Sequence, residues 1–229
     1  MRGRIVRSLA CAVLLLAGLA SCGPAKPDAA STPKGPVRWE LFGKELIGRW
    51  KEAEMLNSGG VQQETDGYTL KAGSPMTGIV FPTWEKDGLP LTSYRVTYEA
   101  MRVSGKDFFG SLTFPAGGVE RCVTFVLGGW GGSQVGISSI DGLDASMNAT
   151  GSAQKFEDGK WYRIRIEVTP ETLFVWLDDR SLAKANIAKA DLSLRSGEID
   201  RCVPFGFASY GTEGRIRNCT VEALSGSPP

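Results

Sequence analysis

Histidine is absent from all 229 residues of the chain. A nucleophile activated by imidazole, as in Ser-His-Asp or Cys-His systems, is therefore excluded. The usual imidazole-ligated zinc and iron sites are excluded for the same reason. Any acid–base chemistry must use Asp, Glu, Lys, Tyr or Cys.

Long apolar runs are absent as well. The apolar stretch Leu9–Leu19 is shorter than the about 20 residues that a membrane-spanning helix needs. It follows Met1–Arg7, which carries three arginines and no acid, and small residues come after it. A basic start, a short apolar segment and small residues before the break are typical of a secretory signal peptide, which we place at residues 1–21.

The residues Leu19–Cys22 read LASC, which resembles the lipobox of bacterial lipoproteins. The resemblance implies that Cys22 is lipidated, becomes the mature N-terminus and carries more than one acyl chain, as stable anchoring requires. Gly23 follows in place of Asp, which by analogy favours the outer membrane. We therefore expect an extracytoplasmic, membrane-anchored protein of the cell envelope. An ordinary signal peptide with an incidental cysteine is the alternative.

The net charge of the chain after removal of the signal peptide is small. Removal of residues 1–21 lowers the formal net charge from +1 to −2. This balance gives no reason to expect nucleic acid or an anionic membrane surface as a partner. Residues 22–37 begin with Cys22 and are rich in Pro, Ala and Ser, so we expect a flexible linker there. Residues 38–225 suffice for one well-buried domain, and 226–229 form a short tail.

Cysteine is scarce in the expected domain. With Cys22 lipidated, only Cys122, Cys202 and Cys219 remain after residue 22. At most one internal disulfide can therefore form. Two alternatives stay open: a Cys122–Cys202 bridge, or three thiols that behave as small buried apolar residues.

Alternation with period two is the main pattern of the domain. Ser93–Val103 and Tyr162–Val168 alternate apolar and polar side chains and are rich in β-branched and aromatic residues. Thr172–Leu177 follows a turn signal at Pro170 and ends at Asp178–Asp179, so we expect a hairpin with the strand before it. Further strands are expected near Tyr68–Lys71, Thr77–Phe81, Phe108–Phe114, Cys122–Leu127, Val135–Ser138, Pro204–Tyr210 and Arg215–Leu224.

The 29 glycines fit short strands joined by turns. No long helical period is present, and only Ala183–Leu194 is expected to hold a turn or two of helix. The sequence therefore predicts an all-β fold, an antiparallel β-sandwich.

Residues 159–179 (GKWYRIRIEVTPETLFVWLDD) resemble the concanavalin A-like lectin/glucanase and laminin-G sandwiches. This resemblance implies a jelly roll with a shallow groove on one curved sheet. The runs LPLTSYRVTYEAMRVSGKDFFGSLTFP, VLGGWGGSQVGISSIDGLDAS and CVPFGFASYGTEGRIRNCTVEAL resemble the 3-keto-disaccharide hydrolase domain (DUF1080). That family implies an extracytoplasmic role in sugar breakdown, with activity on glycosides oxidised at carbon 3.

Two carboxylates are candidates for catalysis. Longer members of the family carry E-x-R followed by N-S-G, whereas here Glu99 precedes Ala-Met-Arg and Asp107 begins Asp-Phe-Phe at the later position. A ketone at carbon 3 acidifies the neighbouring C–H, so one carboxylate base could expel the leaving group by elimination, with a cation to hold the enolate. Asp107 could instead be a solvated residue at a strand start. Glu99 could form an ordinary cross-strand ion pair with Arg163 or Arg165.

A tryptophan within a glycine cluster is the main candidate for ligand binding. Gly129 and Gly131 flank Trp130 in the run GGWGG, which removes side-chain bulk beside the ring. A pyranose could stack on such a ring and approach the neighbouring backbone. The alternative is a tryptophan that closes one end of the core, with glycines that shape a bend.

An oxygen-rich loop follows in the sequence. Asp141, Asp144 and Asn148 are three and four residues apart in SSIDGLDASMN. Such a cluster could hydrogen-bond sugar hydroxyls or hold a divalent cation such as Ca²⁺, although it matches no EF-hand spacing. Turn formation by Asp and Asn explains the same residues without a ligand.

The sequence leaves three functions open. One is a structural envelope lipoprotein whose sandwich binds protein, and the other two involve sugars. The first is an envelope-anchored hydrolase or lyase of the 3-keto-disaccharide hydrolase type, acting on glycosides or oligosaccharides and needing no organic cofactor. The second is a non-catalytic carbohydrate-binding module on a lipid anchor. Both have a carbohydrate as the ligand.

Overall fold

The computed structural model describes residues 36–224. The expected signal peptide, the lipidation at Cys22, most of the linker and the tail lie outside the described residues, so these features stay predictions. Within residues 36–224, no helix is long enough and apolar enough to cross a membrane.

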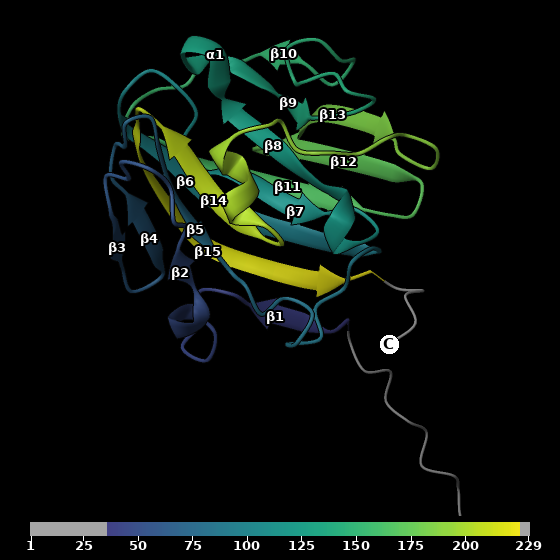
Figure 1. Ribbon diagram of the computed structural model, residues 1–229. Helices are drawn as coiled ribbons and strands as arrows, with labels where there is room; N and C mark the ends of the chain where they lie inside the picture. The colour runs from purple at the N-terminus through teal and green to yellow at the C-terminus, as the bar shows by residue number, and fades with distance from the viewer. Residues whose placement is uncertain (1–35, 225–229) are drawn as a thin grey trace, which may run out of the picture. The chain divides into compact units, whose positions relative to one another are not determined.

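Two antiparallel sheets pack face to face, which confirms the predicted β-sandwich (Figure 1). In the eight-stranded sheet, here called sheet A, the order is β13-β12-β11-β6-β15-β4-β3, and β1 also pairs with β15. In the seven-stranded sheet B the order is β10-β9-β8-β7-β14-β5-β2. The strands of sheet A are β1 (Arg38–Glu40), β3 (Val61–Gln63), β4 (Gly67–Leu70), β6 (Tyr94–Ser104), β11 (Trp161–Val168), β12 (Thr172–Leu177), β13 (Arg180–Asn186) and β15 (Glu213–Ala223). Those of sheet B are β2 (Lys51–Glu52), β5 (Met76–Val80), β7 (Ser111–Pro115), β8 (Cys122–Gly128), β9 (Gln134–Ser138), β10 (Ser152–Ala153) and β14 (Gly206–Tyr210).

Helical structure is limited to single turns in the described part of the chain. These are η1 (Ile47–Arg49), η2 (Val119–Arg121), α1 (Gly129–Gly132) and η3 (Glu198–Cys202). The expectation of one or two helical turns in Ala183–Leu194 is wrong. The first part of that range belongs to β13, which pairs with β12, and the rest is irregular, with a bend at residues 188–189, and buries Ile187 and Leu192 in the core.

The predicted hairpin is present as β11 and β12, with Val168 opposite Leu173. Alternation along β6 is also as predicted. Tyr94, Val96 and Tyr98 are fully buried, while the side chains between them lie on the outer face of sheet A.

Aromatic rings fill the space between the sheets. The centre of the Phe207 ring of β14 lies 4.9 Å from that of Tyr98 in sheet A and 5.7 Å from that of Trp50. Trp84 stacks on Phe205 at 4.4 Å and is fully buried. Such contacts between rings from both sheets join the two layers into one core.

A second, smaller apolar cluster lies on the outer face of sheet B. It contains Ala53, Met55, Met76, Ile199, Cys202 and Ala208, with Phe108 and Leu194 packed against it. It forms because η3 packs against β5 and β14 (Figure 1). The segment around η3 therefore covers one part of this sheet face and leaves the rest open.

The three cysteines of the described domain are free, so the Cys122–Cys202 bridge is wrong and the alternative of buried thiols holds. The Cys122 thiol donates to the carbonyls of Val119 and Pro204, whereas Cys202 lies in the smaller cluster. Cys219 belongs to the main core. Burial raises the pKa of Cys122 to about 12, and it also raises the pKa values of Cys202 and Cys219.

We predict that Cys122, Cys202 and Cys219 resist alkylation in the folded protein. Burial keeps each thiol protonated at pH 8, and the thiolate is the nucleophile. Peptide mapping after iodoacetamide treatment should find all three unmodified, and all three modified once guanidinium unfolds the chain. Two cysteines that stay blocked in the unfolded, unreduced chain would show that a disulfide exists after all.

Candidate functional site

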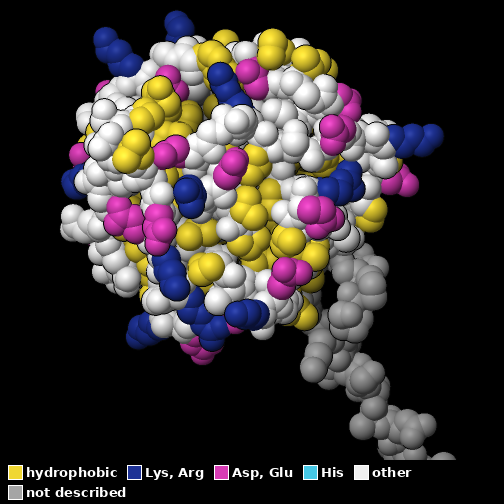
Figure 2. Space-filling model, in the orientation of Figure 1, with side chains coloured by type: hydrophobic (Ala, Val, Ile, Leu, Met, Phe, Trp, Pro, Cys, Tyr) yellow, Lys and Arg dark blue, Asp and Glu magenta, His cyan; other side chains and the backbone are white. Residues whose placement is uncertain are grey.

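A groove of about 490 Å³ lies on the outer face of sheet B. It crosses the sheet from β9 to β5. The floor is formed by outward-facing residues of adjacent strands, namely Ser138 of β9, Thr124 and Val126 of β8 and Ser111 of β7. The other lining residues are Pro75, Met76, Asp107, Phe108, Trp130, Arg195, Ser196, Gly197, Glu198, Ile199 and Tyr210. In Figure 2 this face shows hydrophobic side chains in hollows between charged ones.

Trp130 stands on a left-handed turn at the end of β8. Its own φ is 48°, and the φ of Gly131 is 90°. Gly129 must be glycine for a different reason, because a Cβ there would lie 2.7 Å from Cγ1 of Val126. The turn raises the indole out of the sheet, and the side chain is 42% exposed. Trp130 therefore does not close the core, and the alternative of a buried ring is excluded.

Exposed aromatic rings are concentrated at this groove. Among the aromatic side chains of residues 36–224, only Trp130 and Tyr210 are exposed, each by 42%, and both line the groove. A second hollow, of about 1040 Å³, lies beside β1 on sheet A. It contains the half-buried Trp39 and paired charges such as Arg95 with Glu222 at 3.7 Å. The smaller groove is therefore the better candidate for ligand binding.

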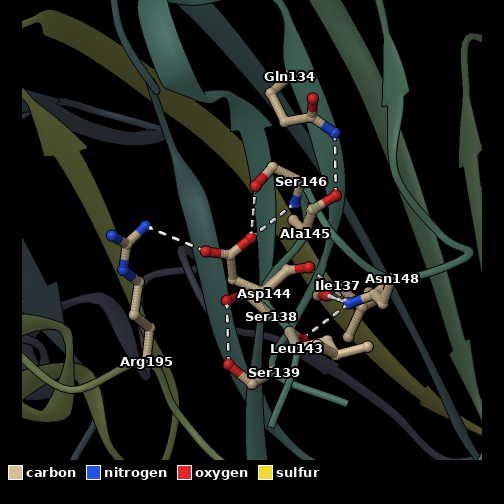
Figure 3. A network of polar contacts seen from close by, with 10 residues as sticks. All are labelled: Gln134, Ile137, Ser138, Ser139, Leu143, Asp144, Ala145, Ser146, Asn148 and Arg195. Carbon is tan, nitrogen blue, oxygen red and sulfur yellow. Dashed lines mark hydrogen bonds and ion pairs between the residues drawn. The ribbon is translucent and has the colours of Figure 1, made fainter. Parts of the chain in front are cut away.

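Arg195 connects the segment before η3 to the Trp130 turn. Its guanidinium lies 5.2 Å from the centre of the Trp130 ring. Its Nη1 atom also lies 3.5 Å from Oδ2 of Asp144 (Figure 3). These contacts position the cation at the rim of the groove beside the indole.

Asp107 lines the groove, as the sequence predicted. Its Oδ1 accepts a hydrogen bond of 2.8 Å from the Phe108 amide, and its Oδ2 accepts one of 3.1 Å from the Gly131 amide. The carboxylate therefore ties the start of β7 to the Trp130 turn. It precedes β7 rather than lying within a strand.

Glu99 was the other candidate base, but it does not line the groove. It lies on the outer face of β6 in sheet A, because its neighbours Tyr98 and Ala100 point into the core. There it forms the cross-strand ion pair that was the alternative, although the partner is Arg217, at 2.6 Å, rather than Arg163 or Arg165.

The loop from residue 141 to 148 uses its polar side chains to hold its own backbone. Asn148 donates from Nδ2 toward the carbonyls of Ile137, Leu143 and Asp144 (Figure 3). Its Oδ1 accepts from the Thr150 amide at 2.9 Å. Oδ1 of Asp144 accepts from both the amide and the hydroxyl of Ser146, at 2.9 and 2.6 Å. Turn formation therefore accounts for both residues.

Asp141 points to another segment rather than to the groove. Its Oδ1 accepts a hydrogen bond of 2.8 Å from the amide of Asp191, and its own amide donates to the Asp191 carbonyl at 2.7 Å. In the described part of the chain, no three side chains of Asp, Glu, Cys or His are grouped so that they could hold a metal ion. Calcium binding at this loop stays a prediction without a built site.

Of the lining residues, only Asp107 and Trp130 were identified as site residues from the sequence. The missed ones include all the other aromatic and charged residues of the groove, namely Phe108, Arg195, Glu198 and Tyr210. Tyr210 could have been found, because inward-facing Phe205 and Phe207 place residue 210 on the outer face. Arg195 and Glu198 lie in a segment without periodicity, so no pattern marked them. Glu198 is held at the groove because its Oε2 accepts from the amide of Leu56 at 2.7 Å.

Comparisons with known proteins support the fold. No protein family model matches the chain, and no curated protein matches its sequence. The carbohydrate binding module CBM66 from Bacillus subtilis aligns with 76% of this chain and 95% of its own, at a TM-score of 0.50 and 13% identity. Domain 4 of AbnA, a GH43 extracellular arabinanase from Geobacillus stearothermophilus solved with arabinotriose, aligns with 83% of this chain and 93% of its own, at a TM-score of 0.50 and 11% identity.

The Crh5 transglycosylase aligns with 83% of this chain and 85% of its own, at a TM-score of 0.52 and 8% identity. At such low identities, the similarity shows a shared β-sandwich fold. The resemblance to the 3-keto-disaccharide hydrolase domain stays a prediction.

We predict that Asn148→Ala lowers the free energy of unfolding by about 2–3 kcal/mol, because carbonyls beside the core would lose their donor. Met147→Ala, at a side chain that is 61% exposed, is the control and should change the unfolding free energy by less than about 0.5 kcal/mol. Urea denaturation measures both. Equal stability of the two variants would refute the structural role of Asn148.

Proposed function

We propose that the groove on sheet B binds a carbohydrate. The observation that carries this proposal is the convergence of the two exposed aromatic rings, Trp130 and Tyr210, on one groove with a partly hydroxyl-lined floor. A pyranose has an apolar face that suits an aromatic ring and hydroxyls that need polar partners. The volume of about 490 Å³ is that of a small-ligand pocket.

Two hydroxyl groups of the floor support the proposal, and each also has a partner within the protein, Thr113 for Thr124 and Ser139 for Ser138. Thr124 and Ser138 are register partners on β8 and β9, and both point outward into the groove. Above them, the Asp107 carboxylate and the Arg195 guanidinium offer a charged acceptor and a charged donor. A few polar groups beside apolar walls are the usual composition of a ligand site that selects orientation.

The known proteins of this fold fit the proposal. CBM66 is named a carbohydrate binding module, and domain 4 of AbnA was solved with arabinotriose. The fold can therefore present a saccharide site. If Cys22 is lipidated, the domain would present this groove outside the membrane, where extracellular glycans are available.

Cleavage of a 3-keto-glycoside is the second candidate function, because two carboxylates, Asp107 and Glu198, line the same groove. In this proposal Asp107 accepts the proton from carbon 2, which the ketone at carbon 3 acidifies. The electron pair forms the enolate and then the double bond between carbons 1 and 2, the bond from carbon 1 to the leaving oxygen breaks, and that oxygen takes a proton from water. No oxidant or reductant is consumed.

We predict that Trp130→Ala weakens saccharide binding by about tenfold or more, because a central exposed ring contributes a large part of the contact. Screening the full-length protein on a glycan array and then titrating the bound oligosaccharides by calorimetry measures the loss. Trp176→Ala is the matched control, because Trp176 lies on the outer face of sheet A, away from the groove. The guanidinium of Arg165 lies 4.2 Å from the centre of its ring. An equal effect of the two substitutions would refute the site, and absence of any glycan ligand would refute the function.

For the second candidate, we predict that Asp107→Asn lowers turnover of 3-keto-trehalose or 3-keto-lactose by about 100-fold or more, the usual contribution of a general base. Glu99→Gln is the matched control and should leave turnover unchanged, because Glu99 lies on the other sheet, paired with Arg217. Thermal unfolding of both variants checks that the fold is retained. If wild-type protein releases no product from either keto sugar, binding without cleavage is the function.

A further inference from the structure

The groove has two chemically different halves. Along the strand order β9-β8-β7-β14-β5, its lining changes from one with several hydroxyls to one that is mainly apolar. The Trp130 half contains Ser138, Thr124, Val126, Trp130 and Arg195. The Tyr210 half contains Pro75, Met76, Phe108, Ile199 and Tyr210, with Glu198 next to Ile199 in the chain. Four strand intervals separate β9 from β5, roughly 19 Å, which is enough for a sugar ring and a second group side by side.

The Tyr210 half is built from side chains that contact one another. The rings of Phe108 and Tyr210 lie 5.7 Å apart at an angle of 51°, and the Tyr210 amide donates to the Phe108 carbonyl. Met76 is the register partner of Tyr210 on β5. Met76 and Ile199 also belong to the smaller apolar cluster, against which Phe108 packs. The Tyr210 half is therefore held in place by its contacts with the smaller apolar cluster.

The lining of the Tyr210 half suits an apolar group better than a second sugar. A sugar placed there would bring several hydroxyls against Met76, Ile199 and Phe108, where their hydrogen bonds to water would be lost without replacement. An aromatic ring, in contrast, can pack at an angle to the two rings and against the thioether of Met76. The half-exposed Tyr210 ring leaves one side open for such a contact.

Asp107 marks the boundary between the halves. Its carboxylate accepts from Phe108, which belongs to the Tyr210 half, and from Gly131, which adjoins Trp130. A ligand with a sugar on Trp130 and an apolar group on Tyr210 would therefore cross Asp107 where its two parts are joined. In a glycoside, that junction is the glycosidic bond.

We propose that the groove selects aryl glycosides, with the sugar on the Trp130 half and the aromatic aglycone on the Tyr210 half. This inference rests on the proposed function of the groove and names the ligand class that the same groove prefers. It assigns Phe108, Met76 and Tyr210 to recognition of the aglycone. Cleavage is not required, since the preference is a property of binding.

Matched pairs of ligands test the proposal. The full-length protein is titrated with the methyl and phenyl members of three pairs, β-D-glucopyranosides, β-D-galactopyranosides and α-D-mannopyranosides, and with phenol alone. For the sugar that binds, the phenyl member should bind about tenfold tighter than the methyl member, the order expected for burial of an aromatic ring. Phenol should bind more weakly than the phenyl glycoside, because it lacks the sugar contacts.

Variants locate the preference in the Tyr210 half. Tyr210→Ala should reduce the ratio of phenyl to methyl affinity to about two or less, because the exposed ring that contacts the aglycone is removed without a change in the core. Tyr210→Phe should keep the preference, since the ring remains. Met147→Ala removes an exposed apolar side chain outside the groove and should keep it as well.

The outcomes separate this inference from the function on which it depends. Equal affinity for the phenyl and methyl members, or a preference that survives in Tyr210→Ala, would overturn the aryl selectivity and leave saccharide binding intact. Tight binding of phenol alone would also overturn it, because the ring would then bind without the sugar. Failure of every pair, together with an empty glycan array, would reject the saccharide site itself.

Discussion

The pleat of the two sheets is the constraint on which the rest of the structure depends. Each strand must give one face to the aromatic core, so only the residues between the core positions can meet a ligand. On β14, Phe207 points inward to Tyr98, which leaves Tyr210 on the outer face. By the same alternation, Glu99 lies on the outer face of sheet A, whereas Asp107 lines the groove on sheet B. These two carboxylates therefore cannot act on one substrate.

Non-strand segments turn one of the two outer faces into a groove. The segment around η3 covers part of sheet B through the smaller apolar cluster, and the left-handed turn at Trp130 rises at the other side. Local hydrogen bonds hold these segments in place. Asn148 organises its own loop, and Asp107 ties the Trp130 turn to the start of β7. These hydrogen bonds hold the Trp130 turn and the Asp107 carboxylate at the groove.

A difference in packing gives the groove its two halves. The side of the groove next to η3 is lined by apolar residues. Met76 and Ile199 line it and also stabilise the contact between η3 and the sheet. The side beyond Asp107 lies outside this apolar contact and carries the hydroxyls of Thr124 and Ser138. The packing that stabilises η3 against the sheet thus also gives this half of the groove its apolar lining.

The sequence by itself determined what depends on near neighbours in the chain. Alternation in Ser93–Val103 and Tyr162–Val168 fixed which residues enter the core, and the glycines around Trp130 indicated an exposed ring. Only the tertiary structure decided which of these residues meet. Trp130 and Tyr210 come together because sheet B places β8, β7, β14 and β5 in a non-sequential order, and Arg195 joins them through its contacts with Trp130 and Asp144. Such pairing depends on the packing of distant strands, which local periodicity does not encode.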